Sequence, residues 1–100
     1  MMSNIDELHK NRFEIIREIK EMPHWVNGSV IESTRKQNGK EYPFYYLSQS
    51  IGGKTQTTYI SAKQLDQFKT AVNNGLKLKS LMSELSLINI KLIKLEVSND

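Results

Sequence analysis

Residues 28–61 read GSVIESTRKQNGKEYPFYYLSQSIGGKTQTTYIS, and this stretch decides the fold. Asn38-Gly39 and Gly52-Gly53 are adjacent pairs that tolerate positive φ, as two-residue hairpin loops require. The segments around these pairs are rich in aromatic and β-branched residues, which favour strands. We therefore expect a three-stranded antiparallel β-meander with strands at about residues 29–36, 41–49 and 55–60.

Two-residue loops also set the register of the meander. Arg35 should face Tyr42 across the first loop, and Tyr46 should face Tyr59 across the second. Because side chains alternate along a strand, the meander has two faces. The aliphatic face carries Val30, Glu32, Tyr45, Leu47, Thr58 and Ile60, and the aromatic face carries Ile31, Arg35, Tyr42, Phe44, Tyr46, Thr57 and Tyr59. We favour the aliphatic face as core, with the aromatic face as the alternative.

A helix should precede the meander at residues 4–22. Ser3 is a candidate N-cap with Asp6 as its partner, and Pro23 stops the helix because it lacks a donor. The apolar stripe of this helix is formed by Ile5, Leu8, Ile15, Ile19 and Met22. Trp25 follows in a connector, where we expect it to pack against the sheet as core.

A long helix should follow the meander at residues 62–96, with Ser61 and Gln64 as its capping box. Asn73-Asn74-Gly75 lies where two apolar stripes change phase, so we expect a kink or a break there. From residue 78 the pattern is that of a coiled coil, with a seam at Leu78, Leu81, Leu85, Ile88, Leu92 and Leu95. Leu87, Ile90 and Ile93 lie off this seam, so the helix is apolar over more than one face. A homodimer that packs through the seam is the simplest way to bury these apolar side chains.

These elements predict a single α+β domain over residues 1–100. The chain has no cysteine, which is typical of a cytoplasmic protein and excludes thiolate metal sites. The first residues do not predict a signal peptide, and no segment has the roughly 20 apolar residues of a membrane span. Positive charge is concentrated at residues 28–80, which hold eight basic and three acidic side chains. Such a distribution favours polyanionic partners.

No catalytic arrangement of residues is apparent. The histidines His9 and His24 stand without carboxylates at metal-binding spacing, and no serine lies in a nucleophile motif. Gly52-Gly53-Lys54-Thr55 lacks the upstream glycine and following helix of a phosphate loop. We therefore expect no enzymatic activity, no metal and no cofactor.

A nucleic-acid interface on the meander is the leading hypothesis for binding. Lysine and arginine contact phosphates, while tyrosine stacks on bases and glutamine bonds their edges. The candidate residues are Arg35, Lys36, Lys40, Tyr42, Tyr46, Lys54, Gln56 and Tyr59. The alternative is that these tyrosines are ordinary strand residues and that the lysines only keep the sheet edges soluble.

Four short motifs and the helix after them carry a family resemblance. Gly28-Ser29-Val30, Tyr45-Tyr46-Leu47-Ser48, Gly53-Lys54-Thr55 and Tyr59-Ile60-Ser61 precede a Leu-rich helix. Over residues 28–95 the chain resembles a family of short uncharacterised prokaryotic proteins with a domain of unknown function, often found near transposase or recombinase genes. Many members carry a cysteine-containing insert between the first two strands, which this chain lacks, so no metal or redox role is implied. The layout also looks like DNA-binding domains of integrase type, as a fold analogy.

Two functions remain open from the sequence. The first is a dimeric, non-enzymatic accessory protein of a mobile element or phage that binds DNA or RNA through the basic sheet. The second is a protein-interaction module that works through the helical seam and binds no nucleic acid.

Overall fold

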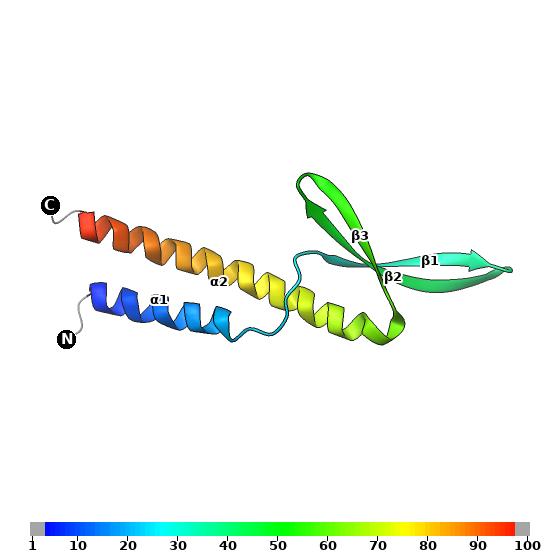
Figure 1. Ribbon diagram of the computed structural model, residues 1–100, viewed down its shortest axis with the longest axis horizontal. Helices are drawn as coiled ribbons and strands as arrows, with labels where there is room; N and C mark the ends of the chain where they lie inside the picture. The colour runs from blue at the N-terminus through cyan, green and yellow to red at the C-terminus, as the bar shows by residue number, and fades with distance from the viewer. Residues whose placement is uncertain (1–3, 98–100) are drawn as a thin grey trace. The chain divides into compact units, whose positions relative to one another are not determined.

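The computed structural model describes residues 4–97 and confirms the α+β fold class (Figure 1). Its elements in chain order are α1 (Asn4–Lys20), β1 (Ser29–Gln37), β2 (Lys40–Ile51), β3 (Lys54–Ile60), the 3-10 turn η1 (Ala62–Gln64) and α2 (Leu65–Val97). The expected cap at Ser3 lies outside the described residues. The capping box at Ser61 is confirmed, because its backbone N–H donates to Oε1 of Gln64 over 3.4 Å.

The chain forms two compact units. Unit 1 contains residues 4–22 and 77–97 of the described chain, which are α1 and the later part of α2. Unit 2 contains residues 23–76, which are the connector after α1, the sheet and the first part of α2. The expectation of a single domain stays a prediction.

The sheet is a meander with strand order β1-β2-β3. Its register is the expected one: Arg35 pairs with Tyr42, and Tyr46 pairs with both Ile31 and Tyr59. Asn38 and Gly39 have φ of 55° and 76°, and both glycines of the second loop also have positive φ. These are the angles of type I′ loops, which match the twist of the strands that they join.

The middle strand β2 is too long for either neighbouring strand to pair with all of it. Residues 45–48 of β2 pair on both sides, while residues 40–44 pair with β1 alone and residues 49–51 with β3 alone. The sheet therefore has a short three-stranded centre from which two hairpin arms extend. Both loops stand at the ends of these arms (Figure 1).

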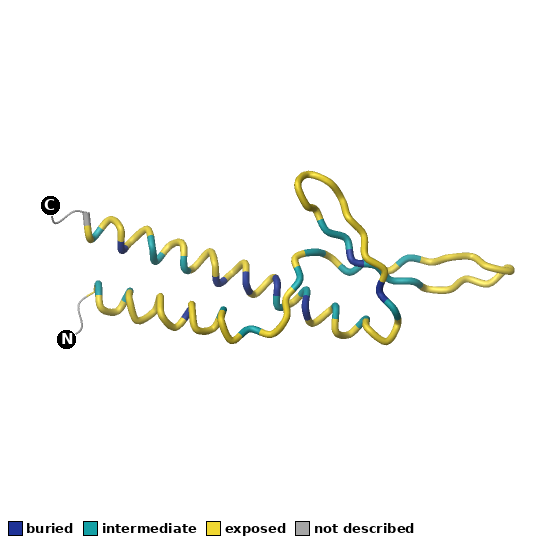
Figure 2. Tube along the Cα trace, viewed as in Figure 1, coloured by how far each residue is buried: buried dark blue, intermediate teal, exposed yellow. Residues whose placement is uncertain are grey.

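The aliphatic face of the sheet is the core of unit 2, as expected. Leu47 is 3% exposed and Ile60 is 1% exposed, and both lie in or beside the three-stranded centre (Figure 2). A hollow lined by Val30 and Tyr45 from the strands and by Val72 from α2 shows that this face looks toward the first part of α2. Trp25 is 51% exposed, so its expected place in the core is wrong.

The path of the connector after α1 explains why Trp25 is exposed and why α2 contains Gly75. Val26 donates its backbone N–H to the carbonyl oxygen of Ala71 over 2.9 Å, and Asn74 Nδ2 donates to the carbonyl oxygen of His24 over 3.1 Å. The connector is thus fixed to α2 by its backbone on either side of Trp25, so this side chain is not needed as an anchor. A Cβ at Gly75 would overlap the carbonyl of Val26.

Helix α2 passes through Asn73-Asn74-Gly75 without interruption, so the alternative of a break there is wrong. The glycine is present because the connector backbone lies against the helix, and helical hydrogen bonds do not require a Cβ. A kink at this point stays a prediction.

Unit 1 is a pair of antiparallel helices. Glu18 Oε1 accepts from Lys77 Nζ at 3.0 Å, and Asn89 Oδ1 accepts from Arg12 Nε at 3.0 Å, so rising numbers on α1 meet falling numbers on α2. The only buried side chain of α1 among the described residues is Ile15. Helix α1 ends at Lys20, two residues earlier than expected, although the amides of Glu21 and Met22 still bond back to its last turn.

Candidate nucleic-acid interface

The aromatic face of the sheet is the candidate site, because it brings planar side chains from two strands to one surface. Tyr42, Phe44 and Tyr46 alternate along β2, so all three point to the same side. Tyr59 on β3 is the direct partner of Tyr46. Arg35 on β1 is the direct partner of Tyr42, which brings a guanidinium to the same face.

The side chains of this face contact one another. The Arg35 Cζ atom lies 5.2 Å from the centroid of the Phe44 ring, within the range of a cation–π interaction. The Phe44 and Tyr46 rings are stacked, with centroids 6.0 Å apart and planes inclined by 26°. The arginine therefore lies over one ring of a stacked pair, which restricts the orientation of its guanidinium.

A shallow hollow of about 330 Å³ opens beside this stack. Its lining consists of Arg35, Phe44, Tyr46, Thr57 and Tyr59. The Tyr59 side chain is 71% exposed and Tyr42 is half exposed, so two rings present open surface to solvent. Such a hollow has the chemistry to take a flat ring against its aromatic walls, with a hydroxyl from Thr57 and a cation from Arg35 at its rim.

The structure divides the eight predicted binding residues between the two faces. Arg35, Lys40, Tyr42, Tyr46 and Tyr59 share the aromatic face by strand alternation and register. Lys36, Lys54 and Gln56 belong to the opposite face, and Lys36 Nζ lies 4.0 Å from Oε1 of Glu41, its cross-strand partner. The eight residues are therefore not brought together as one surface.

One residue of the hollow is absent from the predicted candidates. Phe44 lines it and has the strand parity of Tyr46 and Tyr59, as does Thr57, which the sequence also places on a possible binding face. Alternation along the strand could have found Phe44. Phe44 offers neither a hydrogen bond nor a charge, so it lacks the usual signal of a binding residue, although the Arg35 guanidinium lies over its ring.

The predicted oligomer seam is used inside the chain. Leu78, Leu81 and Leu92 are buried, while Leu85, Ile88 and Leu95 are half-buried (Figure 2). Within unit 1 they are covered by the apolar stripe of α1, in which Ile15 is buried and Leu8 and Ile19 are half-buried. A second copy cannot contact the buried leucines without displacing α1. The large apolar side chains that unit 1 leaves at least one-third exposed are Phe13, Ile16, Met82, Leu87, Ile90 and Ile93.

The described residues were also considered for a metal site and for a membrane-spanning helix. Across residues 4–97, no group of three or more histidine, aspartate or glutamate side chains is placed to hold a metal ion. In the same part of the chain, neither helix combines the length and apolarity that a bilayer crossing demands.

The fold and this face define a small α+β protein with an aromatic sheet surface in one unit and a pair of helices in the other. Comparison with known families assigns it more closely. The model of a domain of unknown function, DUF6788, matches residues 5–70, which is about two thirds of the chain. The chain therefore belongs to that family. No curated protein and no solved structure matches it.

Proposed function

We propose that this protein binds nucleic acid through the aromatic face of its sheet, as a non-enzymatic accessory protein of a mobile element or phage. The observation that supports binding is the exposed cluster of Arg35, Phe44, Tyr46 and Tyr59 around one hollow. The mobile-element context rests on the family resemblance alone, and a cytoplasmic location stays a prediction.

Single strands suit this face better than a duplex does. Stacking on an aromatic ring needs an unpaired base, because the bases of a duplex already stack on one another. Tyr59 is 71% exposed and Tyr42 is 49% exposed, so both rings are open to such a base. A duplex would instead be held by phosphate contacts, and Arg35 is the one cationic side chain among the residues that line the hollow.

The test is fluorescence anisotropy with labelled single-stranded DNA, single-stranded RNA and duplex DNA at low salt. Tyr59→Ala removes an exposed stacking surface worth about 1–3 kcal/mol per base, so we expect single-strand binding to weaken by about tenfold or more. The fold should survive, since Tyr59 is exposed.

Arg35→Glu and Lys36→Glu form a matched pair. They change charge equally and are adjacent in β1, but their side chains point to opposite faces. We expect Arg35→Glu to weaken binding several-fold more than Lys36→Glu. Equal losses would show that binding follows the charge of the hairpin arm and not the aromatic face, and absence of binding at low salt would end the proposal.

The second candidate is an interaction module that acts through the helices and binds no nucleic acid. The observation that favours it is the set of apolar side chains that unit 1 leaves exposed although its seam is already covered. Under this alternative, charge and tyrosine substitutions in the sheet would have no effect on the partner.

A further inference from the structure

Unit 1 has a second apolar surface beside its covered seam. A helix turns by about 100° per residue, so residues three or four apart share a face. On α2 this spacing joins Met82, Ser86, Asn89 and Ile93, with Ile90 next to them. On α1 it joins His9, Arg12 and Ile16, with Phe13 next to them.

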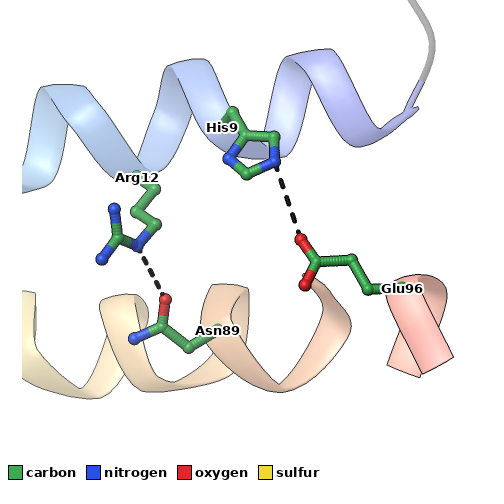
Figure 3. Close-up of polar contacts among 4 residues, drawn as sticks. All are labelled: His9, Arg12, Asn89 and Glu96. Carbon is green, nitrogen blue, oxygen red and sulfur yellow. Dashed lines mark hydrogen bonds and ion pairs between the residues drawn. The ribbon is translucent and has the colours of Figure 1, made fainter. Parts of the chain in front are cut away.

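Contacts across the pair show that these two faces lie on the same side of unit 1 (Figure 3). Arg12 donates to Asn89, and His9 Nε2 lies 3.9 Å from Oε1 of Glu96. Since Arg12 shares its face with Ile16, and Asn89 shares its face with Met82 and Ile93, apolar side chains from both helices surround these polar bridges. We call this surface the flank; its apolar members are Phe13, Ile16, Met82, Ile90 and Ile93.

At the edge of the flank, α2 carries a shallow hollow of about 650 Å³. Its lining is Lys79, Met82, Ser83, Ser86 and Leu87. The two serines are short, so the hollow lies over them, between the longer side chains of Met82 and Leu87. Met82 and Leu87 give it apolar walls, and it has room for a large side chain.

Phe13 is the side chain that matches this hollow. It is 68% exposed, the highest value among the large apolar side chains described in unit 1. It follows Arg12, whose partner is Asn89, and Ser86 lies about one turn before Asn89. Along the pair of helices, Phe13 therefore lies within about one turn of Ser86, near one end of the hollow, but on the other helix.

We propose that a second copy of this chain covers the flank, with Phe13 of each copy seated in the α2 hollow of the other. A two-fold axis parallel to the helices keeps every residue at its own height and brings α1 of one copy beside α2 of its partner. The neighbouring helices are then antiparallel, as in an up-and-down four-helix bundle. The same contact forms twice, which is the property of an isologous interface.

The area of the flank supports this occupant. Its apolar side chains and Leu87 are between 36% and 68% exposed. At roughly 100 Å² of exposed surface for each of these side chains, they offer about 500–600 Å² of apolar surface per chain. With a polar rim added, this is close to the roughly 800 Å² that each partner buries in a standard interface. One chain carries both the protruding ring and a hollow within about one turn of it in height, so two copies complete each other without a third component. This inference is independent of nucleic-acid binding.

Light scattering of the full chain gives the first test. We expect the native protein to have twice the chain mass of 11.6 kDa, and Phe13→Asp or Ser86→Trp to have the mass of one chain. Ser80→Trp is the matched control, since Ser80 is exposed and lies about 120° around α2 from Ser86. It should stay dimeric, and circular dichroism should show unchanged helix content in all three variants. A native chain of single mass, or a dimer that Phe13→Asp and Ser86→Trp leave intact, overturns the proposal.

Crosslinking gives the second test and shows which residues of the two copies lie next to each other. The native chain has no cysteine, so single cysteines can be introduced without background. Phe13→Cys chains mixed with Ser86→Cys chains should be joined by a short bis-maleimide, while Phe13→Cys mixed with Ser80→Cys should not. Equal crosslinking of both mixtures would show that a dimer uses a different surface and would overturn the assignment of Phe13 to the hollow.

Discussion

Gly75 shows how one residue without a side chain fixes the course of the connector. It lies inside α2, and the space where its Cβ would stand is taken by the carbonyl of Val26. The hydrogen bonds from Val26 to Ala71 and from Asn74 to His24 hold the connector at this close distance. Glycine costs about 1 kcal/mol of helix propensity relative to alanine, and here close backbone contact offsets that cost.

Gly75→Ala should therefore destabilise the protein although it raises helix propensity. The added methyl group must push the connector away from α2, and we expect a loss of about 1–3 kcal/mol in the free energy of unfolding. The control is Asn73→Ala, an exposed position in the same helix, where alanine should be neutral or slightly stabilising. Urea unfolding of both variants measures the difference, and a more stable Gly75→Ala would refute the close approach.

At the scale of elements, α2 makes different contacts along its length. Its first part lies toward the aliphatic face of the sheet in unit 2, and its later part pairs with α1 in unit 1. The heptad pattern of the seam is typical of a coiled coil between chains, but an antiparallel helix of the same chain satisfies it equally well. The seam therefore contributes stability to the single chain, while the flank is left exposed.

Leu81→Ala and Leu76→Ala test this division within one helix. Leu81 belongs to the buried seam, and Leu76 is exposed. We expect Leu81→Ala to lower the free energy of unfolding by about 2–5 kcal/mol, since it opens a cavity against α1. Leu76→Ala should change it by less than about 0.5 kcal/mol. Similar losses at both positions, measured by thermal or urea unfolding, would contradict the burial of the seam inside the chain.

At the scale of the whole molecule, only two of the four basic side chains of the sheet lie on the aromatic face. Arg35 and Lys40 belong to that face, whereas Lys36 and Lys54 belong to the other face. The net charge of +3 is small, so long-range attraction of a polyanion is modest. Stacking, and not phosphate neutralisation, should then dominate binding.

Single-strand binding should accordingly depend only weakly on salt. If Arg35 and Lys40 neutralise the phosphates, a plot of log affinity against log salt concentration should have a slope of about −1 to −2. Anisotropy titrations over a range of salt concentrations measure this slope. A slope steeper than about −3 would mean that basic residues outside the aromatic face contact the nucleic-acid backbone. It would argue against stacking as the main contribution to binding affinity.

The sequence by itself determined the β-meander, its register and the order of its elements, while burial in the structure decided between its two candidate core faces. Those features depend on local rules: positive φ at Asn38-Gly39 and Gly52-Gly53 sets the loops, and alternation along the strands then assigns every side chain to a face. Only the tertiary structure decided what depends on distant parts of the chain. It showed that Gly75 accommodates a connector, that Trp25 is half exposed and that α1 covers the seam. The pattern of a helix defines its apolar faces, but which neighbour covers each face is a property of packing between elements far apart in sequence.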